Sequence, residues 1–270
     1  AAEEALFTWI VSDFGLNDAI ESGLVKTPRV VVRDDSERTK ELKSRLYHIY
    51  ADDEVKDDIN RKADETEPLP DLLINAYYLL GKDWLETKKE WESVGHKVPP
   101  VIITVANRTE TSSRIKYAFD HNQILIPELC APDKTLQIDS KVLDKAESET
   151  EALELDLETD DDSDDTPKLT KAQQAELLRQ TVDTVGKEGE PGEQIQNVIS
   201  VGMLSEGWDA KTVTHIMGLR AFSSQLLCEQ VVGRGLRRVS YDVGDDGLFE
   251  PEYVNIFGVP FTFLPHEGGE

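Results

Sequence analysis

The chain has 270 residues, with 54 acidic and 29 basic side chains, so its formal net charge is -25 at pH 7. This charge opposes non-specific binding to nucleic acid, which needs a cationic surface. The two cysteines are too few for a disulfide framework or a four-thiolate zinc site, the five histidines lack zinc-site spacing, and no apolar run is long enough for a membrane span. We therefore expect a cytoplasmic protein with reduced thiols, no resident metal site and no membrane partner.

The first third of the chain predicts helices and one short extended run. A short helix or loop precedes the extended run at residues 28–32. Residues 37–50 and 70–94 place apolar side chains at helical spacing, and Pro70 suits the first turn of the second helix. We expect residues 1–98 to form a linker and helical segment.

From residue 99 onward the pattern alternates between strands and helices. The β-branched run at 101–105 is typical of a strand buried on both faces of a parallel sheet. Further strands are predicted at 135–138, 198–201, 213–217 and 253–257, and helices at 110–119, 170–185 and 223–238. This alternation indicates βαβ units, and therefore an α/β fold with a doubly wound parallel sheet.

A strongly acidic tract interrupts this pattern at about residues 144–168. Every charged residue between 147 and 165 is acidic, and no aromatic residue occurs there. Like charges without aromatic residues favour a disordered surface insertion.

Two arginines near the C-terminus form the most specific motif in the chain. Residues 230–238 read QVVGRGLRR, which places Arg234 and Arg237 about one turn apart on a predicted helix. Two guanidinium groups at this spacing can neutralise the charge that develops on a transferring phosphoryl group. The alternative is a surface helix whose arginines pair with the many carboxylates of this protein.

A second motif, SVGMLSEGWD at residues 200–209, follows a predicted strand. Ligands of open α/β sheets bind at the carboxyl ends of strands. Gly207 allows a close backbone approach, and Asp209 can accept a hydrogen bond from a ribose hydroxyl or brace an arginine. A plain turn with a packed tryptophan has the same pattern.

In order and spacing, these two segments resemble motifs V and VI of superfamily-2 helicases and translocases. The chain is most similar to the motor (Res) subunit of type III restriction enzymes and related restriction helicases. The strand at 101–105 with Asn107, Arg108 and Thr109 resembles motif IV of that family, and residues 12–23 resemble the segment after the first motor domain. The similarity covers most of the chain apart from the acidic insertion. A helix N-cap is the alternative for residues 107–109.

The resemblance implies that residues 99–270 are the C-terminal RecA-like domain of an ATP-dependent helicase or translocase, with a parallel sheet flanked by helices. ATP with Mg²⁺ would bind between this domain and an N-terminal motor domain. The implied partners are DNA, or alternatively RNA, and a methyltransferase or specificity subunit. Catalytic roles would fall to Gln230, Arg234 and Arg237, nucleotide contacts to Gly207, Asp209 and Gly233, and nucleic-acid contacts to Asn107, Arg108, Thr109 and Ser205.

The sequence lacks the parts that would hold a triphosphate. It contains no G-x-x-x-x-G-K-[ST] loop. Residues 52–54 (DDE) resemble the Mg²⁺-binding acidic box of such motors, but they follow a helical pattern rather than a buried strand. We therefore expect a fragment, the second half of a motor, with negligible ATPase activity of its own.

Two other functions compete with this hypothesis. Asp133 with Asp139 and Lys141 mimics the PD…(D/E)xK pattern of metal-dependent nucleases, although the short separation allows only a very tight hairpin. The acidic tract also leaves open a non-catalytic RecA-like module that docks partners through its acidic surface.

Overall fold

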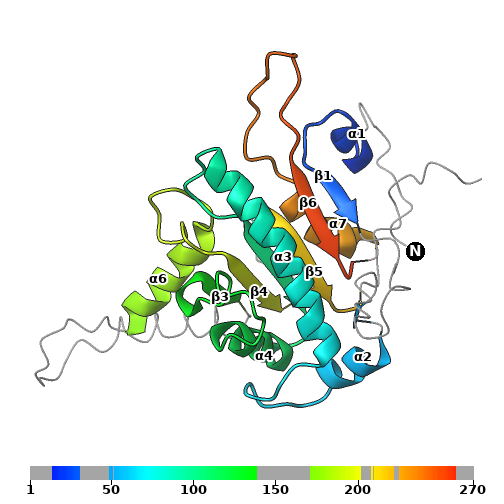
Figure 1. Ribbon diagram of the computed structural model, residues 1–270, viewed down its shortest axis with the longest axis vertical. Helices are drawn as coiled ribbons and strands as arrows, with labels where there is room; N and C mark the ends of the chain where they lie inside the picture. Colours follow the sequence, from blue (N-terminus) through cyan, green and yellow to red (C-terminus); the bar gives the residue numbers. More distant parts are fainter. Residues whose placement is uncertain are drawn as a thin grey trace, which may run out of the picture.

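A six-stranded parallel sheet lies at the centre of the protein, with helices on both of its faces (Figure 1). The computed structural model describes residues 14–30, 49–50, 52–138, 171–201, 208, 210–221 and 225–259. The strand order is β1-β6-β5-β2-β4-β3. This architecture confirms the expected α/β class and the parallel sheet.

Most of the predicted elements form within one or two residues of their expected bounds. The strands are β1 (Thr27–Val30), β2 (Val101–Ala106), β3 (Thr135–Ile138), β4 (Asn197–Val201), β5 (Val213–Leu219) and β6 (Tyr253–Phe257). The helices are α1 (Leu16–Glu21), α2 (Asp53–Asn60), α3 (Asp71–Ser93), α4 (Thr109–Asp120), α6 (Lys171–Asp183) and α7 (Gln225–Gly235), with a 3-10 turn, η3 (Pro132–Lys134). The acidic tract and most of the helix predicted at 37–50 lie outside the described residues.

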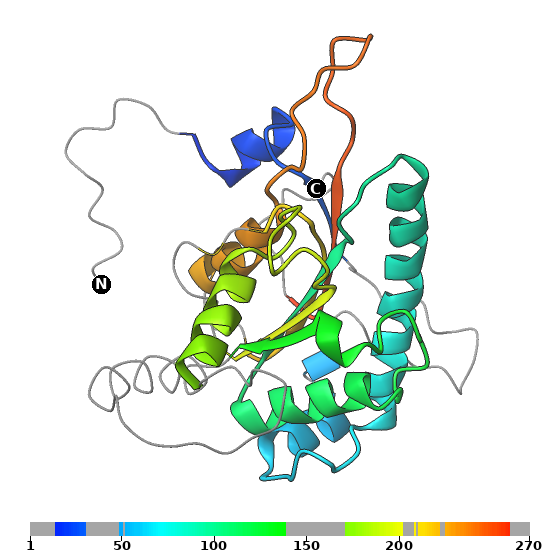
Figure 2. The ribbon, with the colours of Figure 1, turned by 90° about the vertical axis from the view of Figure 1, so that its left-hand side faces the viewer.

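The two faces of the sheet carry separate hydrophobic cores. Helices α2, α3 and α4 pack on one face and α6 and α7 on the other, as Figure 2 shows. Alternate residues of β2 divide between the two cores: Ile102 and Ala106 face the first, whereas Ile103 faces the second. Every residue of β2 is buried, which explains why its sequence is a continuous β-branched run rather than an alternating one.

The N-terminal part of the chain belongs to the same sheet and core. Strand β1 pairs with β6 in parallel, and α3 covers the first face. The buried Lys26 donates from Nζ to the carbonyls of Lys211 (2.6 Å) and Val213 (2.7 Å), and burial lowers its pKa to about 8. The boundary expected near residue 98 therefore separates segments that pair with one another in one sheet.

Helix α7 ends earlier than the sequence predicts. It was expected to continue to residue 238 but ends at Gly235, after which the Leu236 carbonyl accepts a hydrogen bond from the Lys26 amide (2.7 Å). The buried Arg238 leads the chain away from the helix, because its guanidinium donates to the Ser240 carbonyl (3.0 Å) and to the Glu250 carbonyl. These contacts with Lys26, Ser240 and Glu250 replace the last helical turn that the local pattern favours.

No helix within the described ranges is both long and apolar enough to cross a bilayer.

Candidate functional site

The motif-bearing segments follow three neighbouring strands at the centre of the sheet. Strand β2 lies between β5 and β4, and its last residue, Ala106, pairs with Leu219 of β5 and Val201 of β4. The chain therefore leaves all three strands at the same carboxyl edge, where open α/β sheets bind their ligands. Asn107 follows β2 and Arg220 follows β5 at this edge.

A hydrogen bond joins the two strongest motifs. Arg234 on α7 donates from Nη1 to the carbonyl oxygen of Trp208 (3.2 Å). Trp208 is itself anchored, since its ring is buried and its Nε1 donates to the Val182 carbonyl on α6 (2.9 Å). Trp208 thereby connects α6 and α7, although 26 positions separate it from each of Val182 and Arg234.

The two arginines do not share one helical face, contrary to what the sequence indicated. Because α7 ends at Gly235, only Arg234 lies on the helix, and Arg237 follows in the next segment. Arg234 is half-buried against Trp208, whereas Arg237 is exposed. Only Arg234 therefore lies on the helix beside Trp208.

The two glycines of the QVVGRGLRR motif have different surroundings. A Cβ on Gly235 would come within 2.8 Å of Ile216 and 3.0 Å of Val254, so this glycine lets α7 pack closely on β5 and β6. A Cβ on Gly233 would meet nothing within 4 Å, and Gln230 on the same helix is exposed. Among the described residues, no side chain therefore covers Gly233. The other predicted residues of these motifs, Ser205, Gly207 and Asp209, lie outside the described residues.

The residues after β2 bind the end of helix α2. Asn107 donates from Nδ2 to the Ile59 carbonyl and to Asn60 Oδ1, both at 3.0 Å, and Arg108 donates to the Asn60 carbonyl. Thr109 is the first residue of α4, and Arg108, at the N-cap position, makes no side-chain capping bond. These contacts give Asn107 and Arg108 a structural role that no local pattern indicated.

A pocket of about 300 Å³ opens at this edge beside Asn107. Its walls include Tyr50, Lys56 and Asn60 from the α2 region and Arg220 from the end of β5. Neither Lys56 nor Arg220 has a carboxylate within 4 Å among the described residues. The sequence did not single out these two cations, because α2 and the end of β5 meet only in the folded protein.

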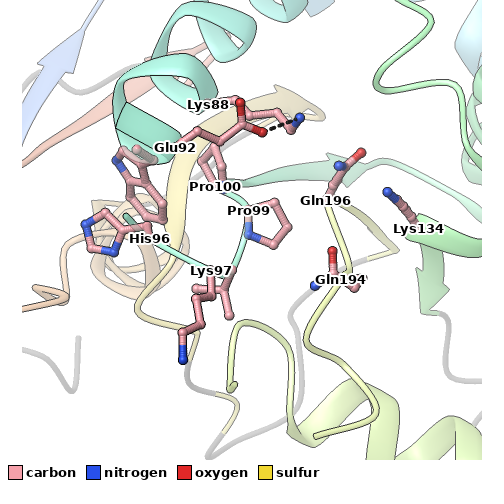
Figure 3. A pocket seen from close by; sticks show the side chains of 11 residues that line it. Lys88, Glu92, His96, Lys97, Pro99, Pro100, Lys134, Gln194 and Gln196 are labelled. Carbon is pink, nitrogen blue, oxygen red and sulfur yellow. Dashed lines mark ion pairs between the residues drawn. The ribbon is translucent and has the colours of Figure 1, made fainter. Parts of the chain in front are cut away.

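A second pocket, of about 260 Å³, lies at the opposite, amino edge of the sheet (Figure 3). The rings of Trp91 and His96 lie 4.8 Å apart on one side of it. Two of the lysines around it are already paired, Lys88 with Glu92 at 2.8 Å and Lys97 with a glutamate from outside the pocket. This pocket is far from the motif residues, and of its three lysines only Lys134 has no carboxylate within 4 Å among the described residues.

A polar network that runs from the buried Thr214 and His215 to the half-exposed Asp83 ties α3 to the sheet. Thr214 Oγ1 lies 2.8 Å from His215 Nδ1, and His215 Nε2 lies 2.9 Å from Asp83 Oδ2, to which Asn255 also donates (2.6 Å). The order resembles a hydroxyl, imidazole and carboxylate relay, but Thr214 is buried and neither pocket above includes it. The network therefore positions helix α3.

The structure describes the first competing acidic motif and only one residue of the second. Asp52 caps α2, where its side chain accepts from the Glu54 amide (3.1 Å), so residues 52–54 begin a helix rather than end a buried strand. Asp133 is exposed on η3, and its partners Asp139 and Lys141 lie outside the described residues. Across the described residues, no three His, Cys, Asp or Glu side chains gather in a way that could hold a metal ion.

Comparisons with protein-family models and with curated proteins find no match to this chain. The resemblance to helicase motifs IV, V and VI therefore rests on the sequence segments themselves.

Proposed function

We propose that this chain supplies the second RecA-like domain of an ATP-driven helicase or translocase of the restriction-enzyme type, acting on DNA. One observation carries the proposal: the Arg234 side chain binds the Trp208 carbonyl, so one residue from each of the two motifs meets the other beside α7. Motor domains of this class need these two motifs side by side, because one senses ATP and the other couples it to the nucleic acid.

The residues present fit a triphosphate at the α7 surface. Gly233 lies under open space, Gln230 and Arg237 are exposed, and Arg234 is oriented by Trp208. ATP with Mg²⁺ supplies the phosphoryl group and neutralises part of its charge when it is bound between this domain and a P-loop domain. The arginines would then stabilise the remaining negative charge of the transition state.

The test is the ATPase rate of the complete enzyme with Arg237→Ala. Loss of an arginine finger lowers the rate by roughly 10³–10⁵. Because Arg237 is exposed and lies beyond the helix, we expect unchanged circular dichroism and thermal unfolding. Arg179→Ala, which removes an exposed arginine from α6, is the matched control and should retain wild-type turnover. Near-normal turnover in Arg237→Ala would refute the proposal.

The charge of -25 favours a second candidate, a non-catalytic module that binds basic partners through its acidic surface. Salt-sensitive binding to a basic protein, unaffected by substitution of Arg234 or Arg237, would support it.

A further inference from the structure

We propose that the pocket between α2 and the carboxyl ends of β2 and β5 binds a phosphate group of a nucleic-acid strand, held by Lys56 and Arg220. Only the choice of a strand as the source of the phosphate rests on the function proposed above.

The fold places the two cations together on one side of a hollow. Ala106 and Leu219 are paired in the sheet, so Asn107 and Arg220 leave neighbouring strands, which are about 4.8 Å apart. Lys56 approaches from α2, which ends at Asn60 beside Asn107. The pocket of about 300 Å³ is lined by Lys56, Asn60, Asn107 and Arg220.

The charge of this pocket contrasts with that of the chain. The protein has an excess of acidic residues, yet Lys56 and Arg220 have no carboxylate within 4 Å among the residues described, and no acidic side chain is among the described lining residues. Cations surrounded by so many carboxylates would gain by pairing with them. Lys56 and Arg220 have no such partner among the described residues, so both side chains are available to bind an anion. Arg and Lys are the usual phosphate ligands.

The end of α2 does not oppose an anion here. Carbonyl groups at a helix C-terminus carry partial negative charge and repel phosphate. In this protein, however, the Ile59 carbonyl accepts from Asn107 Nδ2 (3.0 Å) and Thr111 Oγ1 (2.9 Å), and the Asn60 carbonyl accepts from Arg108. These donors compensate the carbonyls and also fix α2 relative to β2, so that Lys56 is presented from a rigid element.

The proposal is tested by fluorescence anisotropy of this chain with a short labelled single-stranded oligonucleotide at low salt. The variants are Lys56→Ala and Arg220→Ala, with Lys82→Ala, an exposed lysine of α3 outside the pocket, as the matched control. We expect about tenfold weaker binding in each pocket variant, because hydrogen bonds to charged groups contribute strongly. The slope of log affinity against log salt should also fall by about 1, and Lys82→Ala should match the wild type.

Competition with ATP and with inorganic phosphate separates the sources of the phosphate. If ATP or phosphate binds and the oligonucleotide does not, and both pocket variants lose that binding, the phosphate pocket stands but a nucleotide or free phosphate is its ligand. If no ligand binds, or if the pocket variants bind as the wild type does, the proposal is overturned. Because Arg220 is half-buried, Arg220→Lys and the exposed Lys56→Ala keep the test valid should Arg220→Ala fail to fold.

This experiment is independent of the ATPase test. Loss of oligonucleotide binding in the pocket variants together with normal ATPase activity in Arg237→Ala would leave the phosphate pocket and remove the motor function. If the pocket variants bind the oligonucleotide normally and Arg237→Ala loses its ATPase activity, the phosphate pocket is refuted and the motor function stands.

Discussion

Arg114 is almost fully enclosed, with 1% of its side chain exposed, and it holds the loop before α3 in place. Its guanidinium pairs with Asp58 (2.7 Å) and donates to the carbonyls of Glu67 (3.1 Å) and Pro68. Burial raises the pKa of Asp58, but hydrogen bonds from Arg114 and Arg61 outweigh this and hold it below its usual value.

We expect Arg114→Ala to lower the free energy of unfolding by about 3 kcal/mol, because it removes the donor to Asp58 Oδ2 and to two carbonyls, while Arg61 still pairs with Asp58 Oδ1. Urea denaturation measures the change. Lys116→Ala removes an ion pair with Asp120 from the same helix, where both side chains are partly exposed, and should cost less than about 1 kcal/mol. Equal losses in the two variants would contradict this role of Arg114.

His215 makes stability depend on pH at the level of a single residue. Burial lowers its pKa, and the neighbouring Asp83 offsets only part of that effect. The pKa of Asp83 is itself lowered, first by its hydrogen bond with His215, so this carboxylate stays ionised at neutral pH. Below pH 6.5 the unfolded chain therefore takes up a proton on this histidine that the folded chain resists.

The unfolding free energy should consequently fall as the pH is lowered from about 7 to about 5.5. Denaturation curves at the two values measure the slope. His215→Gln should flatten it, whereas His121→Gln, at an exposed position of the loop after α4, should retain it. An equally steep slope in His215→Gln would show that other groups cause the pH dependence.

At the scale of elements, the close packing of α7 on the sheet depends on Gly235, one of the two glycines in this helix. Gly235→Ala places a methyl group 2.8 Å from Ile216 and should cost about 1–3 kcal/mol. Gly233→Ala meets open space within the same helix and should stabilise the protein by about 0.5–1 kcal/mol.

Thermal unfolding of the two glycine variants distinguishes these effects, and the ATPase rate of the complete enzyme adds a functional readout. If a nucleotide approaches α7 at Gly233, Gly233→Ala should lower turnover although it raises Tm. A lower Tm for Gly233→Ala than for Gly235→Ala would contradict the packing seen here.

For the whole molecule, the N-terminal strand closes one edge of the sheet. Strand β1 covers β6, and Leu16, Val25 and Val30 pack against the second core. Removal of residues 1–31 would make β6 the edge strand of the sheet, with one side exposed, and would remove the Lys26 hydrogen bonds. We expect a loss of stability on the order of 3 kcal/mol and a greater tendency to aggregate.

Chemical denaturation and light scattering test this expectation. Removal of residues 1–13 alone keeps β1 and separates its effect from that of a shorter chain. If the longer deletion unfolds as the intact chain does, residues 1–31 behave as a linker, as the sequence had suggested.

Local patterns in the sequence were sufficient to predict the elements. The β-branched run of β2, the apolar stripe of α3 and the alternation of strands and helices predicted a parallel α/β sheet, because burial on two faces or on one helical stripe constrains neighbouring residues. The motif residues Arg234 and Gly233 were also recognisable from their spacing. Their roles in ATP hydrolysis stay predictions.

Only the tertiary structure determined how these elements meet. It placed β1 in the sheet, ended α7 at Gly235, and used Asn107 to hold α2. It also brought Lys56 and Arg220 to one pocket, although they lie far apart in the chain. Contacts between distant segments depend on the strand order and on long-range hydrogen bonds. The periodicity of a sequence indicates only which side of each element is buried.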